Sequence, residues 1–333
     1  MVFLLRASLL TGVCNLIEDQ GGKPAHQLRR YGIHPAIETM PDSFVQFDAA
    51  VRLLEACARD LECPNFGLQL STRQGLSMLG PVAVLARNAN NVEDAFFQIA
   101  KFMHLLTPSI RLEVATIPER GVAQIQFVPI DSRHKHAPQM YELTMGNGQS
   151  ITRLLSGTKA RGTYINFTHS PVSSKQTYRD FFECDVRFNQ EVCSAEMSID
   201  IVQRAIAGAD RETARLAAAY LEDQVSNTSE NLVSQIKQLI ARLLPTGHCT
   251  MNIIAEQIHL HPRTLQRQLS VEGKTFEQIL DDERKRLALH YLAIPHLKLT
   301  QIAGLLGYAE QSALNRSCKR WFDQTPNQLR SKG

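Results

Sequence analysis

The sequence predicts a mainly α protein in which an α+β domain at residues 1–225 precedes an all-α domain at residues 226–333. Three observations support this division. Apolar residues recur with helical spacing over most of the 333 residues, whereas the alternation typical of strands is largely confined to residues 111–188. Residues 250–330 contain one two-helix pattern twice. The polar run at residues 226–229 contains no apolar side chain and is the expected domain boundary.

The first domain is expected to combine short helices with a few strands. Residues 2–13 predict an amphipathic first helix rather than a signal peptide, because Arg6 interrupts the apolar run and no small-residue cleavage site follows. Ser43 or Asp48 is expected to cap the helix through residues 51–58. Further helices are expected at residues 68–75, 82–88, 95–106, 138–155, 174–183, 199–207 and 212–224. The run from Asn91 to Asp94 is expected to cap the helix at residues 95–106. Strands are expected at residues 111–117 and 122–128, joined as a hairpin, and at residues 162–168 and 185–188.

A helix at residues 232–244 is expected to open the second domain, and the repeated pattern follows it. Each copy consists of a helix, a three-residue break and a second helix, which is typical of a helix-turn-helix unit. An alanine lies where the two helices would cross, because a larger side chain would push them apart. Apolar residues four apart on the second helix face inward, so the residues between them face outward. Superposition of the copies aligns Ala255 with Ala303, Leu265 with Leu314, Arg267 with Arg316 and Leu269 with Cys318.

The outward-facing residues of both second helices are suited to reading DNA bases. Arg matches the paired acceptors of guanine, and Asn or Gln matches the donor and acceptor edge of adenine. Two amphipathic hairpins with merely solvated outer faces are the alternative, but two copies with matching polar faces favour base reading. The candidate base-reading residues are Arg263, Gln266 and Arg267 in the first unit and Gln311, Ser312, Asn315 and Arg316 in the second.

A helix at residues 276–293 is expected to link the two units. Its apolar stripe consists of Leu280, Leu287 and Tyr291, and Pro295 stops it nearby. Two ion pairs with the acid four residues before the base are expected on its surface, Asp281 with Lys285 and Asp282 with Arg286. Thr325 is expected to cap a last short helix that begins at Pro326. If the two units enter successive major grooves, this rigid connection must separate them by about 34 Å.

Basic residues are concentrated in the second domain. Residues 230–333 contain 14 Lys and Arg against 9 Asp and Glu, whereas the first 229 residues contain 22 against 24. This distribution indicates attraction of phosphate at one end of the chain, and double-stranded DNA is the expected partner. The candidate phosphate contacts are Lys274, Arg284, Lys285, Arg286, Lys319 and Arg320.

Several motifs of the second domain occur in a known order and spacing. They include Ile-Ala-Gly-Leu-Leu-Gly-Tyr at residues 302–308, Asn-Arg-Ser-Cys-Lys-Arg-Trp-Phe at residues 315–322, and the runs at residues 264–269 and 325–330. The last hundred residues resemble the DNA-binding domain of the AraC/XylS family of bacterial transcription regulators. The resemblance implies that the same seven residues read bases, and that the output is activation by recruitment of RNA polymerase.

Three positions depart from the family pattern. His259 replaces the glycine usual at the first turn and must tolerate a positive φ. His261 replaces a serine cap, so the start of its helix is expected to be weaker. Cys318 replaces a bulky phenylalanine, so looser packing of the second unit is expected.

The first domain resembles the arabinose-binding-like sensor domain found in one branch of that family. The similarity lies in residues 68–95, with Gly75, Gly80 and Asn-Val-Glu-Asp-Ala at residues 91–95, and in residues 181–188. It implies that a small-molecule effector binds here and that the chain forms a homodimer. It does not identify the effector or the residues that bind it.

The sequence gives no support for an enzyme, a metal site or a cofactor. His134 and His136 lack partners at metal-site spacing and are expected in an exposed loop. Residues 146–150 match no phosphate-binding motif, and their small side chains predict a helix crossing. The seven cysteines include no Cys-x-x-Cys pair and indicate reduced thiols in the cytoplasm. No run of 18 residues lacks charge, so no membrane span is expected.

The sequence therefore predicts a cytoplasmic, sequence-specific DNA-binding transcription regulator controlled by an effector. Two alternatives remain at this point. The first domain could serve only for dimerisation or contact with protein partners, or the chain could be an enzyme whose C-terminal helices form a scaffold.

Overall fold

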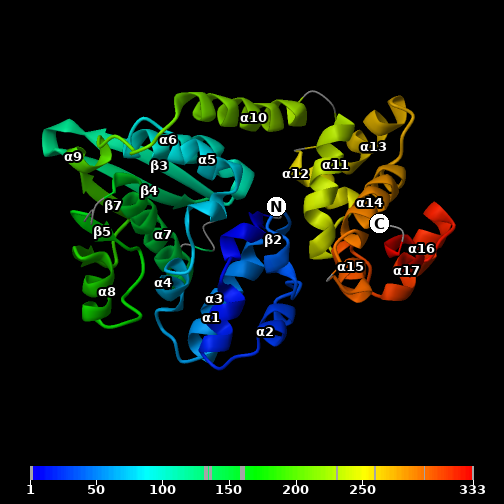
Figure 1. Ribbon diagram of the computed structural model, residues 1–333, viewed down its shortest axis with the longest axis horizontal. Helices are drawn as coiled ribbons and strands as arrows, with labels where there is room; N and C mark the ends of the chain where they lie inside the picture. The colour runs from blue at the N-terminus through cyan, green and yellow to red at the C-terminus, as the bar shows by residue number, and fades with distance from the viewer. Residues whose placement is uncertain are drawn as a thin grey trace.

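The structure is a computed structural model that describes residues 3–130, 134, 137–157, 162–229, 232–258, 260–295 and 297–331. It is mainly helical, and its strands all lie in the first part of the chain. Figure 1 shows a lobe with a sheet on one side, a lobe of short helices on the other, and the N-terminal segment between them. The expected fold class is confirmed.

The N-terminal segment forms a strand pair instead of the expected helix at residues 2–13. β1 (Leu4–Arg6) pairs antiparallel with β2 (Phe44–Gln46), and a single 3-10 turn (Ala7–Leu10) follows β1. A strand is favoured over a helix here because pairing with β2 satisfies the backbone hydrogen bonds of β1. Its side chains also enter two separate hydrophobic cores, since Leu4 and Leu5 belong to different buried clusters. Residues 1–2 lie outside the described residues.

The capping prediction for the following helix is wrong as well. α3 (Phe47–Asp60) begins directly after β2. Asp48 lies inside its first turn, and the Ser43 hydroxyl donates to the Met40 carbonyl at 2.8 Å. The helix therefore follows the strand without a loop, and no side chain caps the N-terminus of α3.

The main sheet has five strands in the order β3-β4-β7-β5-β6. The expected hairpin is confirmed as β3 (Ile110–Ile117) and β4 (Val122–Pro129). The expected strands β5 (Tyr164–Asn166) and β6 (Asp185–Arg187) form a parallel pair.

The sequence analysis missed the central strand. β7 (Cys193–Ser198) lies between β4 and β5 and is antiparallel to both. Its sequence, Cys-Ser-Ala-Glu-Met-Ser, contains no β-branched or aromatic residue, so its neighbours rather than its own propensity place it in the sheet. The helix expected at residues 199–207 is shortened to α9 (Ile199–Val202).

Helices pack on the sheet and extend the first lobe. Asn91 caps α6 (Val92–Leu106) as expected, because its Oδ1 accepts a hydrogen bond from the Asp94 N–H at 2.8 Å. The expected small-residue crossing in α7 (Pro138–Ser156) is also present, since a Cβ on Gly146 would overlap the Ser71 side chain of α4 (Phe66–Ser71). The remaining helices of this lobe are α1 (Val13–Asp19), α2 (Pro24–Arg30), α5 (Pro81–Arg87), α8 (Lys175–Phe182) and α10 (Arg211–Ser229).

The polar run at residues 226–229 is the end of a helix rather than a linker. α10 continues through Ser229, and α11 (Leu232–Leu243) opens the second lobe. The domain division at residues 225 and 226 stays a prediction. The other helices of the second lobe are α12 (Met251–Gln257), α13 (Pro262–Val271), α14 (Phe276–Leu292), α15 (Leu299–Leu305), α16 (Gln311–Phe322) and α17 (Pro326–Arg330).

The two lobes share a hydrophobic core. Leu4 and Phe44 of the β1–β2 pair, together with Met40, belong to the same buried cluster as Ile240 and Leu244 of the second lobe. The Arg242 guanidinium stacks over the Phe44 ring, 5.0 Å from its centroid. The N-terminal segment therefore joins the two lobes by packing, in addition to the covalent connection after α10.

A buried carboxyl group lies on the face of α7 that packs inward. Glu142 is fully buried, and its Oε1 accepts a hydrogen bond from the Tyr178 hydroxyl at 2.5 Å, while its Oε2 has no partner among the described residues. Burial raises the pKa of Glu142 to about 8, and nearby Glu55 adds to the rise. The folded chain therefore holds this carboxyl protonated at neutral pH.

We expect Glu142 to make the folded state less stable as the pH rises from about 4.5 to about 8. The folded state binds a proton here that the unfolded chain has already released, so each pH unit costs up to about 1.4 kcal/mol of unfolding free energy. Urea unfolding across this range should show a flatter profile for Glu142→Gln, which imitates the protonated form. His34, His104 and His169, whose pKa values burial lowers, titrate in both proteins and cancel in the difference. Identical profiles would contradict the assignment.

Candidate nucleic-acid interface

The first helix-turn-helix unit is formed by α12 and α13. Ala255, where the helices cross, is fully buried, and Leu265 and Leu269 point inward as expected. His261 caps α13, because its Nδ1 accepts a hydrogen bond from the Arg263 N–H at 3.3 Å. Thus imidazole replaces the expected serine hydroxyl as the cap, although the bond is long. The turn residue His259 lies outside the described residues.

The second unit is formed by α15 and α16 and has the same plan. Ala303 is buried at the crossing, and Leu314 and Cys318 are fully buried on the inner face of α16. Its turn contains Gly307 at φ +72°, where an added Cβ would also lie 3.1 Å from the Leu244 carbonyl oxygen. Only glycine suits both constraints. The Tyr308 hydroxyl and the Ser317 hydroxyl, 2.8 Å apart, then hold the turn against α16.

α14 connects the two units, and its buried residues belong to the same hydrophobic core as Leu265 of the first unit and Leu314 of the second. Thr275 and Gln278 form a capping box at its start, and its buried face includes Ile279 and Leu287. Its Asp281 carboxylate accepts a hydrogen bond from Trp321 Nε1 at 2.8 Å and forms an ion pair with Arg320. Both partners lie on α16. The linker helix is therefore bonded directly to the second recognition helix.

The two ion pairs expected along α14 do not form. Asp281 bonds to α16 instead of Lys285, because Arg320 and Trp321 approach it from that helix. Arg286 pairs with Glu283 at 2.5 Å rather than with Asp282. Glu283 is 6% exposed, so this pair lies partly inside the core. Both corrections arise from tertiary contacts that sequence spacing does not reveal.

We expect Asp281→Ala to lower the free energy of unfolding by about 1–2 kcal/mol, since it removes two hydrogen bonds and leaves the Trp321 N–H unpaired. The neighbouring exposed Asp282 provides the control, and Asp282→Ala should change stability by less than about 0.5 kcal/mol. Urea unfolding of both variants measures the difference. Equal losses would show that the bond between α14 and α16 contributes nothing.

The candidate base-reading residues lie on the outer faces of α13 and α16. Six of them are exposed and Gln311 is half-buried. Among the described residues, the only side-chain hydrogen bond made by this set runs from Ser312 to Glu310, at 3.2 Å. The exposed donors and acceptors are therefore available to an external partner. The exposed residues are Arg263, Gln266, Arg267, Ser312, Asn315 and Arg316.

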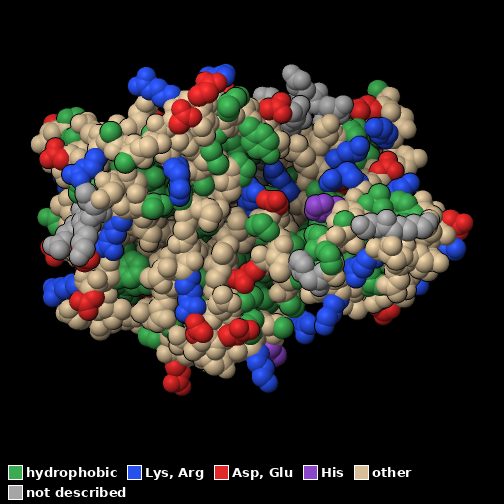
Figure 2. Space-filling model, viewed as in Figure 1, with side chains coloured by type: hydrophobic (Ala, Val, Ile, Leu, Met, Phe, Trp, Pro, Cys, Tyr) green, Lys and Arg blue, Asp and Glu red, His purple; other side chains and the backbone are tan. Residues whose placement is uncertain are grey.

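The candidate phosphate contacts differ from the base-reading residues, because most of their side chains already bond to other residues of the chain. Arg284 Nε donates to the Leu306 carbonyl at 2.9 Å, and its guanidinium stacks 4.7 Å from the centre of the Tyr308 ring. Lys319 pairs with the exposed Asp323 at 3.0 Å, a bond that water and salt weaken strongly. The Lys285 ammonium lies over the Phe322 ring, whereas Lys274 is exposed. Figure 2 shows Lys and Arg side chains spread over the helices of this lobe.

The sequence analysis named no effector-binding residue, but the first lobe contains a cavity. The cavity lies between α6, α7 and the β3–β4 hairpin, and Leu5 of β1 also lines it. Its volume, as the space open to the centre of a water molecule, is 80 Å³. Its lining is almost entirely apolar, so the sequence of the lining residues cannot be distinguished from that of an ordinary hydrophobic core.

The histidines, cysteines and long helices are the candidates for metal ligands, disulfide partners and membrane spans. Among the described residues no cluster of three or more His, Cys, Asp and Glu could hold a metal ion. His134 is not exposed as expected, because it packs edge-on against the Phe47 ring at 5.2 Å; His136 lies outside the described residues. All seven cysteines are free thiols. No described helix combines the length and the apolar character needed to cross a bilayer.

Comparison with known proteins finds counterparts for both lobes. Two family models match: the arabinose-binding domain of AraC transcription regulator, N-terminal, at residues 21–206, and a helix-turn-helix domain at residues 254–332. The HTH-type transcriptional regulator VirS of Mycobacterium tuberculosis is 42% identical over 99% of this chain and 97% of its own length. The ornithine utilization regulator of Pseudomonas aeruginosa is 25% identical over 90% of this chain and 88% of its own. The crystal structure of transcriptional regulator CdpR from Pseudomonas aeruginosa aligns with 92% of this chain and 96% of its own at a TM-score of 0.46 and 20% identity.

Proposed function

This chain belongs to the AraC/XylS family of DNA-binding transcription regulators, and we propose on that premise that an effector in the first lobe controls how its two helix-turn-helix units read DNA. One observation supports the proposal that these units read bases. The outer faces of α13 and α16 present Arg267 and Arg316 at matching positions, exposed and without internal partners among the described residues. The buried faces of the same helices hold these side chains in place.

α14 gives the two units a fixed relation. Its 17 residues span roughly 25 Å at 1.5 Å per residue, and Asp281 and Arg284 bond it to the second unit, at Trp321 of α16 and at the Leu306 carbonyl. Two recognition helices on such a connection can enter successive major grooves on one face of B-DNA. The basic side chains beside them, Lys274 and Lys319 among them, would then meet phosphates and add affinity without adding sequence preference.

We expect Arg267→Ala and Arg316→Ala each to weaken binding to the specific site by about 1–3 kcal/mol, because each removes a bidentate contact to a base. Lys319→Ala should instead weaken binding to cognate and random DNA alike and reduce the dependence on salt. Titration of labelled cognate and scrambled duplexes at several salt concentrations measures both effects. If the arginine variants lose affinity equally on the two duplexes, these residues do not read bases.

The proposed homodimer has a candidate surface on α10. Its inner face packs on the core through Leu221, which is 2% exposed, whereas Leu216 and Tyr220 are 57% and 54% exposed one turn apart. Figure 1 shows α10 along the outer edge of the first lobe. Two copies that pair through this face would remove both apolar side chains from water.

We expect Leu216→Glu combined with Tyr220→Glu to convert the dimer into a monomer, because four carboxylates would meet at the shared face. Leu154→Glu is the matched control, since Leu154 is 52% exposed on α7. Sedimentation velocity at several concentrations distinguishes the two states. A dimer that survives the double substitution would place the interface elsewhere.

Control by an effector is favoured over a first lobe that only dimerises, because this lobe contains a cavity and shares a core with the DNA-binding lobe. We propose that occupancy shifts the chain between arrangements with different DNA affinity, by no more than the effector's preference for one arrangement. The output we propose is activation through contact with RNA polymerase, in the cytoplasm where the DNA lies. Transcription from a promoter with the cognate site, in a purified system, tests activation directly.

A further inference from the structure

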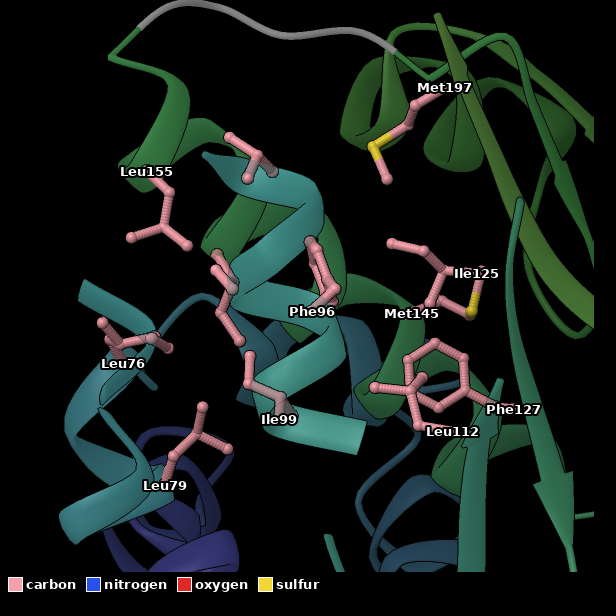
Figure 3. Close-up of a cluster of buried hydrophobic side chains, with 14 of the residues drawn as sticks. Leu76, Leu79, Phe96, Ile99, Leu112, Ile125, Phe127, Met145, Leu155 and Met197 are labelled. Atoms are coloured by element: carbon pink, nitrogen blue, oxygen red, sulfur yellow. The ribbon is translucent and has the colours of Figure 1, made fainter. Parts of the chain in front are cut away.

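The cavity of the first lobe is a mostly apolar space. Five of the residues labelled in Figure 3 line it, and they come from α6, the 3-10 turn before α5 and the β3–β4 hairpin. They are Leu79, Phe96, Ile99, Leu112 and Phe127. A volume of 80 Å³ is several times the space that one water molecule requires. A water molecule would find few hydrogen-bond partners among these apolar side chains. An apolar molecule of suitable size needs no such partners and therefore fits the cavity better.

Three polar side chains line this space, and two of them are already bonded. The Thr107 hydroxyl donates to the Leu4 carbonyl at 2.9 Å, and the Thr144 hydroxyl donates to the Met140 carbonyl at 2.7 Å. The third, Asn147, is 8% exposed, and its Oδ1 has no hydrogen-bond partner among the described residues. A buried acceptor without a partner is costly, and a ligand that supplies a donor would remove that cost.

The orientation of the Asn147 amide follows from its neighbours. Gln74 Nε2 donates to the carbonyls of Leu9 and Thr11, each at 3.0 Å, and carbonyls can only accept. Gln74 Oε1 must therefore face Asn147 and accept from its Nδ2, at 2.8 Å. This leaves the Asn147 oxygen, not its nitrogen, as the unpaired atom.

We propose that this cavity is the effector site and that it takes a small, mostly apolar molecule with a single hydrogen-bond donor, which bonds to Asn147 Oδ1. The proposal rests on the control by an effector proposed above. A free sugar does not suit the site, because burial of several hydroxyl groups against Leu, Ile, Met and Phe would leave most of them unpaired.

β1 connects the cavity with the DNA-binding lobe. Successive side chains of a strand point to opposite faces, so Leu5 lines the cavity while Leu4 enters the core shared with α11. The Leu4 carbonyl is also held by Thr107, which lines the cavity. A ligand that displaces Leu5 or Thr107 would therefore shift Leu4, which belongs to the core of the second lobe.

Calorimetric titration of the full chain with phenol, anisole and L-arabinose tests the ligand class. Phenol and anisole share a ring, but methylation removes the donor from anisole. We expect phenol to bind about tenfold more tightly than anisole, since only phenol pairs with Asn147, and arabinose to give no heat. Equal affinity for phenol and anisole, no binding of either, or tighter binding of arabinose would overturn the proposal.

Three variants locate the site. Asn147→Leu should abolish the preference for phenol over anisole, and Thr144→Val, whose hydroxyl is already bonded within α7, should retain it. Ile99→Phe adds volume inside the cavity and should block both probes while the chain still folds, as its circular dichroism would show. Binding that survives Ile99→Phe would place the ligand elsewhere and overturn the proposal.

DNA titration with and without phenol separates this inference from the function on which it rests. We expect phenol to change the affinity for cognate DNA in the wild type and not in Ile99→Phe. Phenol that binds in the cavity without changing DNA affinity would overturn the effector role, while DNA reading by α13 and α16 would stand. Failure of both wild type and variants to prefer cognate DNA would instead overturn the proposed function.

Discussion

The arrangement of the second lobe depends on how firmly α14 is packed against its neighbours. Most of the stability of a helix in a protein comes from packing of its apolar face, and here Ile279 and Leu287 are buried while Asp281 bonds to α16. Each recognition helix in turn rests on its own buried residues, Leu265 in α13 and Leu314 in α16. The separation of the two outer faces is therefore a property of packing, and the side chains on those faces can vary without changing it.

Periodicity and spacing were sufficient to predict the elements whose stability is local. The two helix-turn-helix units, the β3–β4 hairpin and the Asn91 cap all follow from patterns within a few residues, and the structure confirms them. The assignments that failed depend on partners distant in the sequence. β1 forms a strand only because β2 lies beside it, and β7 is central only because β4 and β5 flank it.

The candidate site follows the same division. Outward positions on α13 and α16 could be predicted, because helical geometry alone determines which residues face away from the core. The cavity could not, since its lining is spread along the chain from Leu5 to Ile151 and has the composition of any core. Even Asn147 gives no signal in the sequence, because its unpaired oxygen depends on the bonds that Gln74 makes to Leu9 and Thr11.

The core shared by the two lobes has a practical consequence for work with fragments. A fragment that ends after α10 would leave Leu4, Met40 and Phe44 uncovered, because their packing partners belong to α11 and the helices after it. Contiguous apolar surface of this kind promotes self-association. A truncated first lobe would thus tend to aggregate even where its own sheet and helices fold correctly.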